Sequence, residues 1–141
     1  MIELADYWMG RDRTHGLLMS VDLQHNAART IELANKLLIL AKTAGVHLHD
    51  NPNTGSIVSS GWRPPDINAR TAGAAKASKH LTGEAIDLYD PQGELGRWLL
   101  TADGQRAMID LGLWQEDPSA TKTWAHVQTR PPGSGRRTFM P

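Results

Sequence analysis

Three potential metal ligands in two short segments place the strongest constraint on how this chain folds. His80 and Asp87 lie in the first segment, Ser78–Asp87, and His126 lies in the second, Thr123–Thr129. Imidazole and carboxylate groups bind divalent cations, so a fold that brings the two segments together would create a metal site. His80 would then approach the ion from the loop that precedes Asp87.

The residue pattern of both segments suits β-strands. Side chains alternate between the two faces of a strand, so Ala85 and Asp87 would share one face of a strand over residues 83–88. A second strand is predicted over residues 124–128. Three of its side chains would share a face: Trp124, His126 and Gln128. If the two strands are neighbours, Asp87 and His126 can converge on one ion.

The ligand set predicts the metal and its chemistry. Two imidazoles and one carboxylate suit zinc and leave a fourth position for water, which is typical of catalytic rather than structural zinc sites. The chain has no cysteine, so thiolate ligands and disulfide bonds are excluded. Either histidine alone is most simply an ordinary loop or strand residue, and only the combined pattern favours a zinc hydrolase.

Length and composition narrow the remaining function classes. The 141 residues fit a single domain, residues 1–141. Lys and Arg number 15, as do Asp and Glu, so no net charge draws the chain towards nucleic acid or an anionic membrane surface. A nucleic-acid site would depend on three arginines in the tail, Arg130, Arg136 and Arg137, and these would contact only a short stretch of nucleic acid. We therefore expect no nucleic-acid partner.

The N-terminal and apolar segments indicate synthesis in the cytoplasm. Met1–Met9 mixes acidic and apolar residues and has no signal-peptide pattern. The most apolar run, Leu37–Ala41, is far shorter than the roughly 20 residues of a membrane span. We expect a chain without a signal peptide and without membrane insertion.

Apolar periodicity predicts one long helix and a pair of shorter ones. The long helix is expected to begin at Ser20, a plausible N-cap, and to end at Ala44, where Gly45 supplies the stop. Helical spacing also runs through Glu94–Leu113, and we expect Gly104 to divide that run into two helices.

The other strand signals are short. A strand over residues 57–62 leads into a proline loop, and a final strand is expected over residues 138–140. Residues 114–118 are interpreted as a turn. Residues 66–77 fit a helical turn or an open loop equally well.

The first ligand segment matches a known signature, Ser-x-His-x-x-Gly-x-Ala-x-Asp. The matching residues are Ser78, His80, Gly83, Ala85 and Asp87. With the Trp-x-His of the second segment, the chain resembles the zinc D-alanyl-D-alanine carboxypeptidases and dipeptidases, which cut bacterial cell-wall peptides and share a fold with the amino-terminal hedgehog domain. Ser60–Pro64 extends the likeness, and Tyr7–Asp12 and Gln128–Arg137 resemble small phage and prophage members.

This resemblance implies an α+β fold, a small antiparallel sheet flanked by helices with zinc on the sheet face. His80, Asp87 and His126 would hold the zinc, and Arg63 would stabilise the oxyanion or anchor a substrate carboxylate. Ser78 would line the substrate cleft. Two further residues would border it: Trp124 and Gln128. The resemblance implies that the substrate is a peptidoglycan stem peptide. The enzyme would be a monomer, and phage lysis would release it to the cell wall or periplasm.

The family's catalytic base is missing from its usual positions. Thr123 and Trp124 stand there, and neither side chain takes a proton from water at neutral pH. Glu116 is the first candidate for a replacement and Asp117 the second, while Glu84 would point away from the metal on a regular strand. Without any base, the chain would instead be a weakly active or inactive zinc module that binds cell-wall peptide.

Overall fold

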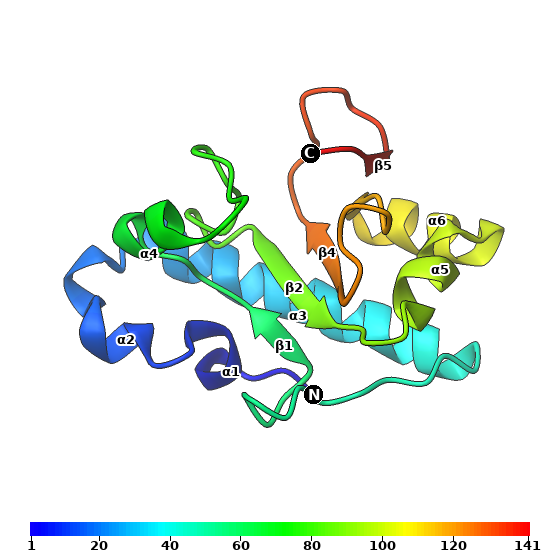
Figure 1. The fold of residues 1–141 in the computed structure, drawn as a ribbon, viewed down its shortest axis with the longest axis horizontal. Coiled ribbons are helices and arrows are strands. Elements are labelled where there is room, and N and C mark those ends of the chain that lie inside the picture. Colours follow the sequence, from blue (N-terminus) through cyan, green and yellow to red (C-terminus); the bar gives the residue numbers. More distant parts are fainter.

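The computed structural model describes residues 1–141 and has a five-stranded sheet surrounded by helices (Figure 1). The strands are β1 (Val58–Ser60), β2 (Ala85–Tyr89), β3 (Trp114–Glu116), β4 (Trp124–Gln128) and β5 (Thr138–Phe139). Their order in the sheet is β1-β2-β4-β3-β5. All neighbours pair antiparallel except β3 and β5, which are parallel. The predicted α+β class is confirmed.

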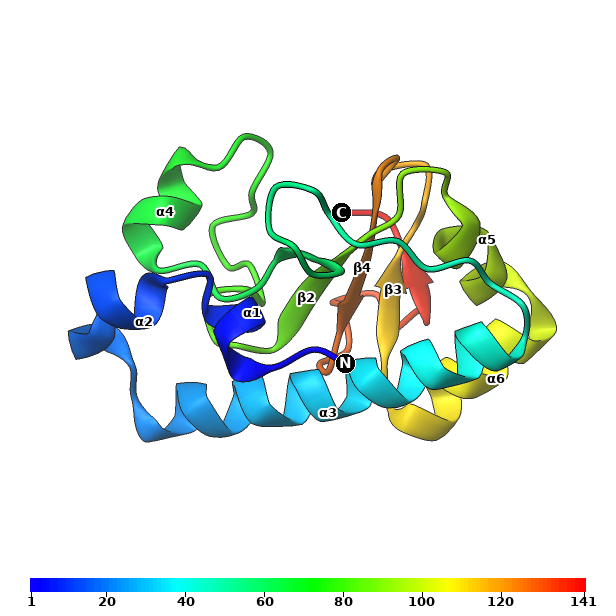
Figure 2. The same cartoon turned by 90° about the horizontal axis from the view of Figure 1, so that it is seen from below.

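The helices surround the sheet on one face and at both ends. They are α1 (Leu4–Trp8), α2 (Arg11–Thr14), the short 3-10 helix η1 (Gly16–Leu18), α3 (Val21–Thr43), α4 (Pro65–Arg70), α5 (Glu94–Leu100) and α6 (Ala102–Leu111). Figure 2 shows α3 running along the sheet, with α1, α2 and α4 towards one end and α5 and α6 at the other. None of the helices combines the length and the apolar character that crossing a bilayer requires.

Helix α3 begins and ends where its capping residues predict. The Ser20 hydroxyl accepts a hydrogen bond from the backbone N–H of Leu23 at 3.1 Å, which satisfies one of the free donors of the first turn. The last helical residue is Thr43, and Gly45 follows with a φ of +90°. The long predicted helix is therefore confirmed.

The buried face of α3 helps to decide which side of the sheet is free for chemistry. Ile86 and Leu88 of β2 and Val127 of β4 are fully buried and belong to the same apolar cluster as the inward side of α3. Because side chains alternate along a strand, Asp87 and His126 point to the other face. The sheet thus separates the hydrophobic core from a polar face.

The helical run after β2 divides at a different residue from the one predicted. The break lies at Thr101, whose hydroxyl caps α6 by accepting from the N–H of Gly104 at 3.2 Å. Gly104 lies inside α6, where an added Cβ would come within 2.1 Å of the Trp98 carbonyl oxygen. The glycine is needed for the close approach of α5 and α6, and the threonine provides the stop.

Residues 114–118 were expected to form a turn, and this expectation is wrong for their first half. Trp114–Glu116 form β3, which pairs with β4 on one side and with β5 on the other. Only the residues after Glu116 turn, where the N–H of Ala120 donates to the Asp117 carbonyl. A three-residue strand has almost no periodicity of its own, so its conformation depends on these two neighbours.

The segment after β1 contains both structures that the sequence left open. Residues 65–70 form the helix α4, which begins with a proline at its first position. An irregular loop follows from residue 71 to residue 79. Asn68 fixes this loop, because its side-chain Nδ2 donates to the Ala75 carbonyl at 3.0 Å.

Candidate metal centre

One row of cross-strand neighbours crosses the polar face of the sheet. Ser60 pairs with Asp87, Asp87 pairs with His126, and Glu116 pairs with Phe139. The antiparallel register of β3 and β4, continued by one residue, places Glu116 beside His126. Adjacent strands lie about 5 Å apart, so this row gathers side chains from all five strands along one line.

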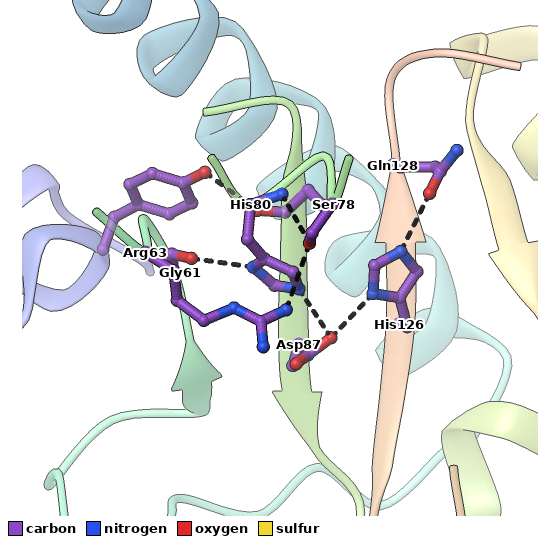
Figure 3. A network of polar contacts seen from close by, with 9 residues as sticks. Gly61, Arg63, Ser78, His80, Asp87, His126 and Gln128 are labelled. Carbon is purple, nitrogen blue, oxygen red and sulfur yellow. Dashed lines mark hydrogen bonds and ion pairs between the residues drawn. The ribbon is translucent and has the colours of Figure 1, made fainter. Parts of the chain in front are cut away.

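The three predicted ligands meet at this row, where His80 approaches Asp87 and His126 from the loop before β2 (Figure 3). The Oδ1 atom of Asp87 lies 2.8 Å from Nδ1 of His126 and 3.2 Å from Nε2 of His80. One potential ligand atom from each residue lies within 4.8 Å of the other two. All three residues are buried, and His80 is completely inaccessible. One carboxylate oxygen is therefore shared by two imidazole nitrogens in a site of the size that a single cation needs.

Outer hydrogen bonds fix which nitrogen of each imidazole faces the shared oxygen. His80 Nδ1 lies 2.7 Å from the carbonyl oxygen of Gly61, which can only accept, so this nitrogen carries a proton. His126 Nε2 lies 2.9 Å from Oε1 of Gln128, and Gln128 Nε2 donates to the Arg130 carbonyl at 2.8 Å, which sets the amide orientation. Such outer partners are typical of metal-binding histidines, because they leave the inner nitrogen free to coordinate.

The electrostatics of the cluster favour a cation at its centre. Burial lowers the pKa of His80, so its ring is neutral near pH 7 and has its one proton on Nδ1. Burial would raise the pKa of Asp87, but the two imidazoles outweigh burial and hold it well below its usual range. The ionised oxygen of Asp87 thus lies beside the inner nitrogens of both imidazoles, and a divalent cation between them would be coordinated by all three.

The pKa of His126 shifts in the opposite direction from that of His80. Burial opposes its charged form, but the hydrogen bond and the charge of Asp87 outweigh burial and raise the pKa of His126. In the metal-free protein this imidazole is the partner that shares a proton with Asp87. A metal ion would replace that proton, which is the usual exchange when a protein ligand coordinates. The donor set therefore fits zinc.

Gly83 brings the His80 loop against α3. Its φ is +76°, and an added Cβ would lie 2.9 Å from the Leu23 side chain and 3.0 Å from the Leu23 carbonyl oxygen. The Thr30 hydroxyl donates to the Gly83 carbonyl at 2.8 Å. The turn is thus anchored to the long helix on one side while His80 reaches the metal centre on the other.

Gly61 holds the other side of the His80 imidazole. A Cβ at this position would lie 2.1 Å from the Tyr7 carbonyl oxygen, so only glycine allows β1 to pass so close to α1. The backbone also pairs here, since Arg63 N–H donates to the His80 carbonyl at 3.1 Å. The carbonyl that fixes the His80 tautomer is therefore held by the packing of the N-terminal helix.

Arg63 places a cation beside the ligands. Its Nη2 donates to the Ser78 hydroxyl at 3.3 Å, and the same hydroxyl accepts from the His80 N–H at 3.3 Å. Its Nε is buried without a hydrogen-bond partner. Burial lowers the pKa of Arg63, while the charges of Asp87 and Glu116 oppose this shift, and a guanidinium stays charged in either case.

A cleft of about 470 Å³ opens over two of the predicted ligands, Asp87 and His126. Its walls include the remaining predicted site residues Arg63, Ser78, Trp124 and Gln128. The loop of residues 71–79 forms one side, and Phe139 and Pro141 of the C-terminal segment form part of the other. A larger pocket of about 670 Å³ lies between α3 and the segment after it, but its lining is mainly aliphatic and contains none of the clustered ligands.

The structure separates the candidate bases. Glu116 lines the cleft, and burial raises the pKa of its carboxyl, with the charge of Asp87 adding to this while His126 and Arg63 oppose it. Asp117 does not line the cleft, because its carboxylate turns back to accept from the Ser119 N–H at 2.9 Å.

Glu84 also lies away from the cleft, where it forms an ion pair with Arg130 at 2.9 Å. The geometry therefore favours Glu116 over the other carboxylates near the ligand segments. Of Glu84, Glu116 and Asp117, only Glu116 lies on the polar face of the sheet with His126 and Asp87.

Sequence reasoning missed three contributors to the site. Ser60 lies in the row beside Asp87, the Gly61 carbonyl fixes His80, and Phe139 packs on His126. Ser60 and Gly61 belong to a segment that was singled out for Arg63 alone. Phe139 is the only phenylalanine of the chain, and it lies in a tail whose composition suggests exposure.

A family model described as Peptidase M15 matches residues 17–110 of the 141-residue chain. The matched stretch includes His80 and Asp87 and ends before Glu116 and His126. Neither a curated protein nor a solved structure matches the chain.

Proposed function

Because the chain belongs to the peptidase M15 family, we propose that it is a zinc-dependent peptidase that hydrolyses stem peptides of bacterial peptidoglycan. The observation that carries this proposal is the sharing of Asp87 Oδ1 by two imidazoles whose outer nitrogens are already hydrogen bonded. The proposed bond is of the D-alanyl-D-alanine carboxypeptidase or endopeptidase type. The proposed setting is phage or prophage lysis, which the likeness at Tyr7–Asp12 supports.

His80, Asp87 and His126 would hold the zinc ion through Nε2, Oδ1 and Nδ1. Bound there, zinc would polarise a substrate carbonyl and lower the pKa of a water molecule at the site. The neutral His80 and the ionised Asp87 have the protonation states that coordination requires.

Glu116 and Arg63 would act on the substrate from two sides of the cleft. Glu116 would accept a proton from the attacking water and deliver it to the leaving amine, as a carboxylate with a raised pKa can do in both directions. Arg63 would direct its guanidinium at the negative charge that develops on the carbonyl oxygen, or at a carboxylate of the substrate. Ser78 holds the guanidinium in place for either task.

The direct test is hydrolysis of purified peptidoglycan sacculi and of synthetic stem pentapeptides by the zinc-loaded protein. We expect release of D-alanine or of a cross-bridge peptide, identified by mass spectrometry. A chelator and Asp87→Ala should each abolish this release, while Asp110→Ala, an exposed carboxylate on α6, should leave it unchanged. If the zinc-loaded protein binds stem peptides and cleaves none, the proposal is wrong and the chain is a binding module.

A further inference from the structure

We infer that Phe139 of β5 is a positioning residue of the metal centre, which restrains the His126 imidazole and walls the cleft beside Glu116. The phenyl ring meets the imidazole edge to face, with ring centroids 6.3 Å apart and an interplanar angle of 88°. Phe139 also lines the cleft, together with Asp87 and His126. This inference rests on the proposed metal site and adds a residue outside the stretch that the family model matches.

Two hydrogen bonds and two neighbouring rings hold the His126 imidazole. One ring is that of His80, with centroids 5.2 Å apart, and Phe139 supplies the ring that is not itself a predicted ligand. Asp87 and Gln128 bind its two nitrogens. The imidazole can still turn about the side-chain bonds that join it to the backbone, and this rotation would redirect Nδ1. An aromatic ring packed at 88° to the imidazole adds a steric restraint on this rotation, on which coordination geometry depends.

The backbone of β5 fixes the position of Phe139. Its carbonyl accepts from the Asp117 N–H at 2.7 Å, and the Arg137 carbonyl accepts from the Gln115 N–H at 2.8 Å. The Thr138 hydroxyl is bound between the side chains of Gln105, at 3.0 Å, and Gln115, at 3.3 Å. These contacts attach the C-terminal segment to β3, the strand that carries Glu116. The β5 strand therefore helps to position both Phe139 and Glu116.

The position of Phe139 also accounts for the surroundings of Glu116. The two residues are partners in the β3–β5 ladder, and the phenyl ring extends from there to His126. Because β3 lies between β4 and β5 in the sheet, a ring that reaches His126 from β5 passes beside Glu116 and forms an apolar wall there. This wall would border the space in which Glu116 activates a water molecule.

The test uses cobalt(II) as a visible probe of the metal centre in the full-length protein, with no peptide substrate. Affinity is measured by competition with a chromophoric chelator, and the visible spectrum reports the ligand geometry. Phe139→Ala should weaken cobalt binding about 2- to 10-fold, the equivalent of one aromatic pair, and should change the spectrum. Phe139→Tyr keeps the ring edge and should restore both. The matched control is Met140→Ala, an exposed neighbour that does not line the cleft.

The outcomes separate this inference from the proposed function. If wild-type protein binds cobalt and Phe139→Ala has the same affinity and spectrum, Phe139 has no positioning role. If wild-type protein binds no cobalt, the metal centre and this inference fall together. Phe139→Leu covers the case in which alanine unfolds the tail, because leucine fills the volume without an aromatic edge and should still alter the spectrum.

Discussion

Asp87 and His126 are direct partners in the β2–β4 ladder, and this pairing brings Asp87 Oδ1 to 2.8 Å from His126 Nδ1. A shift of the ladder by one residue would turn one of the two side chains into the hydrophobic core. The register of two central strands therefore determines whether the metal centre exists. His80 would add the third ligand from a loop that Gly61 and Gly83 hold in place.

Replacing Glu116 tests the proposed base. Glu116→Gln keeps the shape of the side chain and removes its ability to accept a proton, so kcat/KM on a stem peptide should fall by about 10²- to 10⁴-fold. Zinc affinity should stay within about twofold, because Glu116 is not among the clustered ligands. Asp117→Asn is the matched control and should be near wild type. Equal losses in both variants would mean that the base is neither residue.

The protonation of Glu116 can be measured directly. Burial raises its pKa, so in the metal-free protein its carboxyl should titrate above the ordinary glutamate value of about 4.3. The carboxylate is the active form, so hydrolysis by the zinc-loaded protein should fall as the pH drops through the pKa that Glu116 has in the presence of zinc. Zinc should lower the value, because a cation stabilises the charged form. Carboxyl ¹³C NMR would measure the pKa of Glu116 with and without zinc, and the Glu116→Gln variant would identify its signal. A pKa at or below the ordinary value in the metal-free protein would contradict this description of the cleft.

Gln128 should matter for metal binding although it is not a ligand. It accepts from His126 Nε2 and thereby leaves Nδ1 to face Asp87. Gln128→Ala should weaken zinc binding by about 10- to 100-fold, the usual loss for an outer partner of a metal-binding histidine. Gln92→Ala, at an exposed position in the turn before α5, is the control. Competition with a chelator measures both variants, and an unchanged affinity would show that the His126 orientation is set elsewhere.

Gly61→Ala tests the packing behind His80. The new Cβ would lie 2.1 Å from the Tyr7 carbonyl oxygen, and neither backbone can move without displacing α1 or β1. We expect a loss of about 1–3 kcal/mol in the free energy of unfolding, measured in urea without metal. Gly16→Ala meets no atom within 4 Å and should be neutral or slightly stabilising. A wild-type midpoint for Gly61→Ala would contradict the observed approach of α1.

Several parts of the fold could be predicted because their signals are local. The strand over residues 124–128 was predicted with its observed bounds, and β2 differs from its prediction by a shift at its ends. The capping serine and the stop glycine of α3 act within a few residues of the helix ends. In each case the residues that decide the structure are neighbours in the sequence.

The parts that could not be predicted depend on distant partners. Glu116 had to be weighed against Asp117 because β3 is a strand only through its pairing with β4 and β5. The strand over residues 138–140 was expected, but the position of Phe139 beside His126 depends on the pairing of β5 with β3. The tail arginines look alike in the sequence, yet Arg130 pairs with Glu84, and Arg137 lies 4.4 Å from the Trp114 ring centroid.

The metal content of the purified protein and of three ligand variants tests the central claim most directly. Zinc is measured by mass spectrometry of the dialysed protein and its affinity by competition with a chelator. We predict one zinc ion per wild-type chain, with affinity reduced by more than about 100-fold in His80→Ala, Asp87→Ala and His126→Ala, beyond the loss expected for outer partners. Zinc binding that survives all three substitutions, or no zinc bound to the wild-type chain, would contradict the account.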